Sequence, residues 1–182
     1  MTRHARLALV LVSLLGILSF GAAWILGFAV EPGIGLASDS YYYLSGADTM
    51  NNGEGFGRIA GNGEFKPTTH FPPIYSVALL ASRALSGERI GSTVVLHQAS
   101  LILTLWLGAW LVYRMSKWKV MPVVFILLAG YSPALLAVNS WMLSEGLFLL
   151  ILALVWVCVH QSQGTNREVW LLLAGLLTGA AY

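Results

Sequence analysis

The chain has 182 residues, of which 57% are hydrophobic and only 10% are charged, and its formal net charge is +2. An ordinary soluble domain is about half apolar and roughly a quarter charged, so water is not the main solvent of this chain. The small net charge, without a cluster of Lys and Arg interleaved with aromatic residues, excludes nucleic acid as a partner. The single cysteine, Cys158, excludes both a disulfide framework and a metal-binding pair of thiols.

Uncharged apolar runs predict an all-α fold, a polytopic transmembrane bundle that forms one domain over residues 1–182. A helix needs ~20 such residues to cross ~30 Å of hydrocarbon. The predicted spans are residues 7–30, 90–113, 120–138, 141–159 and 169–182. The last run has 14 residues, short of a full span, so we expect the natural protein to continue beyond Tyr182.

The first run has a second interpretation, because Arg3 and Arg6 before it are also typical of a secretory signal peptide. The apolar region of a signal peptide is usually ~7 to 15 residues long and ends at a small-residue cleavage site. Here 24 uncharged residues follow, Leu7 to Val30, without a clear cleavage site. The run therefore favours a spanning helix.

Positive charge predicts the orientation of the spans, because Lys and Arg concentrate in short cytoplasmic segments. Short segments before and between the apolar runs carry one set of basic residues: Arg3, Arg6, Arg114, Lys117, Lys119 and Arg167. The long loop 31–89 carries fewer basic residues for its length: Arg58, Lys66, Arg83 and Arg89. The N-terminus is therefore expected in the cytoplasm and the loop 31–89 outside it. We expect a multi-pass protein of the plasma (inner) membrane.

The loop 31–89 is where chemistry is expected, because seven of the eight acidic residues lie on the predicted outer side. Ser38-Asp39-Ser40 predicts the capped start of a short helix that ends near Asn51. Tyr43, Ala47 and Met50 form one stripe of this helix, which predicts that it lies on the bilayer surface.

The second half of the loop has a different character. Five glycines between residues 53 and 63 indicate a mobile segment. Pro72 and Pro73 then predict the start of a short apolar helix over Ile74–Leu85 that leads back to the membrane.

The order of these features resembles the GT-C superfamily of glycosyltransferases. Closest in pattern are the bacterial and archaeal relatives of dolichyl-phosphate-mannose protein mannosyltransferases and the aminoarabinose transferase of lipid A. The resemblance rests on Asp39 shortly after the first span, Tyr43, Ala47, the NNGEGF turn, HFPPIYSVALLAS before the second span, Ser144-Glu145, and LLLAGLLTGAAY at the end. It covers nearly the whole chain, with short and degenerate motifs.

The resemblance implies inverting transfer of a sugar from a polyprenyl-phosphate donor to a protein, lipid or glycan hydroxyl at the outer membrane surface. Such transfer needs a base for the acceptor proton and cations for the leaving phosphate. The resemblance makes Asp39 the base and places Tyr43 beside the substrate. His70, Lys66 and Arg58 are the candidate phosphate ligands, although some relatives have a lysine directly before the proline where this chain has Phe71 and Pro72.

Each of these residues also has a purely structural interpretation. Asp39 could cap its helix, and His70, Lys66 and Arg58 could be exposed loop charges. Glu145, at the start of the fourth run, is expected near the lipid phosphate, through a water or a divalent metal, or as a charge at a helix N-terminus. No cofactor is otherwise indicated. His97 and Gln98, inside the second run, are expected to make hydrogen bonds between helices.

Two other functions remain open. A membrane transporter should have charges or broken helices near the midplane, whereas this chain keeps its charges at the rims and has only Gly130 and Pro133 as interruptions. The chain could also be a truncated, inactive GT-C-like fragment. The isolated chain is expected to be inactive.

Overall fold

The computed structural model describes residues 3–30, 34–87 and 90–181. Within them the fold is helical, apart from one two-stranded sheet. The elements are α1 (Arg3–Ala29), α2 (Ser38–Asn51), β1 (Gly57–Ile59), β2 (Phe65–Pro67), α3 (Ile74–Ser86), α4 (Gly91–Met115), α5 (Met121–Gly130), α6 (Pro133–Asn139), α7 (Glu145–Gln161) and α8 (Arg167–Ala181). Arg89, one of the basic residues expected outside the cytoplasm, and Tyr182 lie outside the described residues, as do Glu31 and Glu88, two of the acidic residues of the loop 31–89.

Two helices are long and apolar enough to cross a membrane, Ala8–Ala29 within α1 and Gly91–Met115, which is α4. A third span is possible if α5 and α6 count as one broken helix, bent by 59°. The bend falls where Pro133 begins α6, because proline has no amide hydrogen for the preceding turn. Two or three spans therefore support a membrane protein, while five spans stay a prediction.

α7 and α8 occupy the predicted fourth and fifth runs but are shorter than the first two spans. α7 has 17 residues and α8 has 15. Residues 141–144, which the sequence analysis assigns to the fourth span, lie outside α7, because the helix begins at Glu145.

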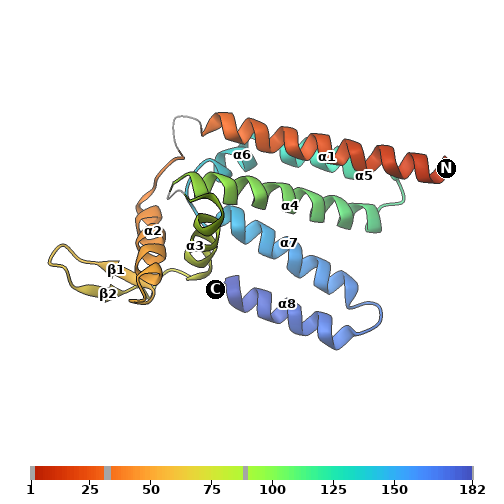
Figure 1. Ribbon diagram of the computed structural model, residues 1–182. Helices are drawn as coiled ribbons and strands as arrows, with labels where there is room; N and C mark the ends of the chain where they lie inside the picture. Colours follow the sequence, from red (N-terminus) through yellow and green to blue (C-terminus); the bar gives the residue numbers. More distant parts are fainter. Residues whose placement is uncertain (1–2, 31–33, 88–89, 182) are drawn as a thin grey trace.

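Residues 38–86, comprising α2, the hairpin β1–β2 and α3, form a cap over one end of the bundle (Figure 1). The N-terminus lies at the opposite end, and α7 begins beside the cap. The core joins both regions: Leu26 of α1, Tyr75 and Leu79 of α3, Leu105 of α4 and Met142 are fully buried. The cap is thus packed onto the bundle.

The structure corrects two expectations for the cap. The stripe of α2 does not face a membrane surface, because Tyr43 and Ala47 are 4% and 0% exposed and pack in the protein core. The glycine-rich segment is also more ordered than expected, since it forms the antiparallel hairpin with Arg58 opposite Lys66. The positive φ angle at Gly63 serves the turn between the two strands, and those at Gly53 and Gly55 serve the connection from α2 into β1.

Candidate functional site

Asp39 lies in the first turn of α2, but it does not cap that helix. The N-cap residue is Ala37, and its backbone N–H donates to Ser40 Oγ at 2.9 Å. Asp39 is partly exposed, and its Oδ1 accepts a hydrogen bond from the Ser38 hydroxyl at 3.1 Å. The capping interpretation of Asp39 is therefore wrong, and its carboxylate remains accessible for chemistry.

The turn between α6 and α7, residues 140–144, is tied to the start of the cap. Gly35 donates its N–H to the Ser140 carbonyl at 2.9 Å and accepts from the Met142 N–H at 2.7 Å. The Ser40 hydroxyl donates to the Met142 carbonyl at 2.6 Å. These bonds join the turn that leads into α7 to the segment that begins α2.

Tyr43 lies between these two turns. The Tyr43 hydroxyl donates a hydrogen bond to Ser144 Oγ at 3.0 Å. The phenol also lies close enough to Asp39 and Glu145 to interact electrostatically with both carboxylates. Burial raises the pKa of the Tyr43 phenol above its usual 10.0; the hydrogen bond to Ser144 opposes this shift, and the two carboxylates add to it. The structure thus gathers three of the residues expected at the site, Asp39, Tyr43 and Glu145.

A cavity of ≈ 130 Å³ lies beside this group. Ser144 and Glu145 form its polar wall, and the rest of its lining is Pro72, Ile74, Leu147, Phe148 and Ile151. Its position at the joint between the cap and α7 brings one carboxylate next to apolar walls. Such a site suits a ligand that is polar at one end and apolar at the other.

Two of the predicted cations, Arg58 and His70, connect to this group through aromatic rings. Arg58 lies over the Tyr42 ring, 5.4 Å from its centroid, and Tyr42 stacks on Phe71 at 4.8 Å. His70 and Tyr43 both contact Phe71 edge to face, with centroids 5.5 and 5.4 Å away. Phe71 therefore links Arg58 and His70 to Tyr43.

Lys66 is the exception among the predicted cations. It is exposed on β2, opposite Arg58 in the hairpin, and no contact joins its side chain to Asp39, Tyr43 or Glu145 within the described part of the chain. The solvated interpretation fits it best.

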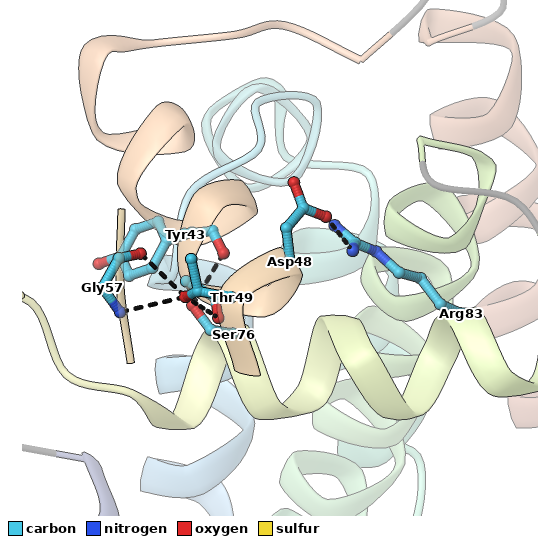
Figure 2. Close-up of polar contacts among 7 residues, drawn as sticks. Tyr43, Asp48, Thr49, Gly57, Ser76 and Arg83 are labelled. Carbon is cyan, nitrogen blue, oxygen red and sulfur yellow. Dashed lines mark hydrogen bonds and ion pairs between the residues drawn. The ribbon is translucent and has the colours of Figure 1, made fainter. Parts of the chain in front are cut away.

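Polar contacts within the cap fix the hairpin and α2 on α3 (Figure 2). Thr49 Oγ1 donates to the Gly57 carbonyl at 3.2 Å and accepts from the Gly57 N–H at 3.3 Å. The Ser76 hydroxyl donates to the Tyr43 carbonyl at 2.9 Å. Asp48 and Arg83 form an ion pair at 2.6 Å. The cap therefore positions Tyr43 and Asp39 as one unit.

A buried hydrogen-bond chain joins the cap to the bundle below the site. His97 Nδ1 lies 2.7 Å from the Asn139 carbonyl, which can only accept, so Nδ1 carries the hydrogen. In the neutral ring Nε2 then accepts from the Tyr75 hydroxyl, also at 2.7 Å. Gln98 donates to the Ala23 carbonyl at 3.1 Å. The prediction that His97 and Gln98 bond between helices is confirmed.

Several residues of this site escape sequence reasoning. Ser40, Phe71 and Tyr75 lie in quoted motifs but receive no role there, and the bond from Tyr43 to Ser144 spans 101 positions. The sequence does offer signals for Asp39, Tyr43, His70 and the pair Ser144-Glu145, which all lie in the motifs that carry the resemblance. The described residues contain no group of three His, Cys, Asp or Glu side chains that could hold a metal.

Comparison with models of known protein families, with curated proteins and with solved structures gives no match to this chain.

Proposed function

We propose that the chain is part of a membrane glycosyltransferase that takes a sugar from a polyprenyl-phosphate donor. The observation that carries the proposal is the placement of Asp39 and Glu145 around Tyr43, at the joint between the cap and the bundle. The resemblance to GT-C enzymes, which names these same positions, supports it. At ≈ 130 Å³ the cavity beside Glu145 has room for only part of such a donor, and its mostly apolar walls suit the start of the lipid chain next to the headgroup.

In the proposed reaction an acceptor hydroxyl attacks the anomeric carbon while Asp39 takes its proton. The bond between that carbon and the phosphate oxygen breaks, and polyprenyl phosphate leaves with the electron pair. Attack opposite to the leaving group inverts the configuration. Phosphate is a good leaving group, so the main tasks for the protein are proton removal and charge neutralisation.

The remaining roles follow from the positions of the side chains. Arg58 and His70, held around Phe71, are the proposed cations for the phosphate. Glu145 is proposed to lie at the headgroup, and Tyr43 to keep the two carboxylates apart. The proposed site faces away from the cytoplasm, as the positive-inside rule predicts for residues 31–89. The proposed acceptor is a hydroxyl of a protein, lipid or glycan.

The test is complementation in cells that lack the gene. Surface glycans and glycoproteins are compared by mass spectrometry after adding back the wild-type, Asp39→Asn or Glu54→Gln gene in full length. Glu54 is the matched control, because it is an exposed carboxylate in the turn after α2. We expect Asp39→Asn to abolish the product without altering membrane insertion, and Glu54→Gln to restore it. A normal product with Asp39→Asn would refute the assignment of the base.

A transporter is the second candidate, and the broken pair α5–α6 favours it. Interrupted helices at membrane depth often line a substrate site. Loss of the gene would then abolish uptake or export of a solute while the surface glycans keep their mass, which separates the two candidates.

A further inference from the structure

A large groove opens at the end of the bundle opposite the cap. It measures ≈ 670 Å³, within the ~300 to 1,000 Å³ typical of ligand pockets. One wall is the first half of α1, with Ala8, Leu11 and Leu14, and the other is the start of α5, with Val120 and Val123.

The walls of the groove belong to the membrane region. α1 and α4 are the two helices able to span a bilayer, and α4 ends directly beside the groove. Leu14 and Val120 are 43% and 56% exposed. Apolar side chains that face outward from spanning helices contact hydrocarbon in a bilayer, so a lipid chain is the natural occupant of this groove.

One end of the groove is positively charged. Tyr113 and Lys119 also line the groove, and the Lys119 ammonium lies 4.1 Å from the centroid of the Tyr113 ring. This cation–π contact holds the charge at the groove. Nearby, Arg114 lies over the Trp110 ring at 5.7 Å.

The surrounding sequence adds to this charge. Lys117 lies in the same connection between α4 and α5. From Ile90 to Ser144 the sequence has no acidic residue. The charge at this end therefore complements an anion.

We propose that this groove binds one anionic glycerophospholipid, with an acyl chain between α1 and α5 and the phosphate against Lys119. The site is independent of the cap and of the proposed sugar transfer. Bound there, the lipid links α1 to the connection between α4 and α5. A cation near an anionic lipid surface contributes ~1 kcal/mol, or about fivefold in affinity.

Native mass spectrometry of the full-length protein tests this site. The protein is presented with equal amounts of phosphatidylglycerol and phosphatidylcholine that carry the same acyl chains. We expect the wild type to retain phosphatidylglycerol about fivefold more than phosphatidylcholine, and Lys119→Gln to bring the two close to parity. Lys117→Gln is the matched control, because it removes an exposed charge of the same connection that does not line the groove.

A second variant, Leu11→Trp, tests the apolar part by filling the groove. We expect it to lose both lipids while its helical circular dichroism is kept. The proposal is overturned if the wild type retains both lipids equally or neither, as when another protein segment covers the groove. It is also overturned if Lys119→Gln and Lys117→Gln behave alike, or if a folded Leu11→Trp protein retains lipid as the wild type does.

Discussion

Replacing Tyr75 by Phe removes one hydroxyl from the buried chain that connects the cap to the bundle. The aromatic ring remains, so its edge-to-face contact with Tyr43 at 4.8 Å is kept. What is lost is the hydrogen bond of 2.7 Å to His97 Nε2. Because Tyr75 and His97 are 0% and 2% exposed, no solvent is at hand to replace it.

The cost follows from the acceptor that is left behind. A buried polar group without a partner costs about 1 to 3 kcal/mol, whereas hydrogen bonds between membrane helices average only ~0.6 kcal/mol. We therefore expect Tyr75→Phe to lower the free energy of unfolding by about 1 to 2 kcal/mol. For a chain of this size that corresponds to a Tm lower by about 2 to 8 °C.

The assay is thermal unfolding of the purified protein in detergent or nanodiscs, combined with hydrogen exchange of the segment 139–148. Thr93→Val is the matched control. Thr93 is also fully buried, one turn before His97 on α4, but its hydroxyl has no hydrogen-bond partner among the described residues. Its removal should leave Tm unchanged or slightly higher.

Hydrogen exchange separates a positioning effect from general loosening. His97 donates a hydrogen bond to the Asn139 carbonyl. The Asn139 side chain packs against Gly146, since its Oδ1 would lie 2.5 Å from a Cβ placed there. The hydrogen bonds of Tyr75 and His97 therefore extend to the first turn of α7. We expect faster exchange in 139–148 and unchanged exchange in the middle of α1. If Tyr75→Phe matches Thr93→Val in both Tm and hydrogen exchange, the hydrogen bonds that join Tyr75, His97 and Asn139 do not stabilise the site, and our reasoning fails.

Three further predictions concern the site and its supports. Gly146→Ala should destabilise the protein by about 1 to 3 kcal/mol, because the new Cβ would approach Asn139 Oδ1 to 2.5 Å. Gly175→Ala should stabilise α8 by about 0.5 to 1 kcal/mol, because a Cβ at Gly175 meets nothing within 4 Å. Thermal unfolding of both variants checks this contrast. Thr49→Val should leave the two bonds to Gly57 unmade and speed hydrogen exchange across the hairpin without changing that of α4, and equal exchange in the variant and the wild type would contradict the proposed role of Thr49. Because the folded-state pKa of Tyr43 is raised above 10.0, the neutral phenol contributes to stability below pH 10, and this contribution is lost as the pH rises further. Tyr43→Phe should therefore show a smaller fall in Tm with alkaline pH than the wild type. An equal fall in the two proteins would count against the burial of this phenol.

Much of the local structure could be predicted from the sequence, because local signals decide it. Long uncharged runs can bury their backbone polar groups only as helices in a membrane, which predicts the helical class and the placement of α1 and α4. The polar start at Ser38 and the prolines before Ile74 mark the beginnings of α2 and α3. Polar groups inside an apolar helix must find partners, which predicts the bonds of His97 and Gln98.

The arrangement of the site was decided by tertiary structure. α2 could expose either face by its own pattern, and the packing of Tyr43 and Ala47 against α3 and the bundle chose the buried one. Asp39 and Glu145 stand 106 positions apart in the sequence. The bonds of Gly35, Ser40 and Tyr43 to residues 140–144 join the segments in which these two helices begin. Such contacts depend on closure of the whole chain, which no local propensity encodes.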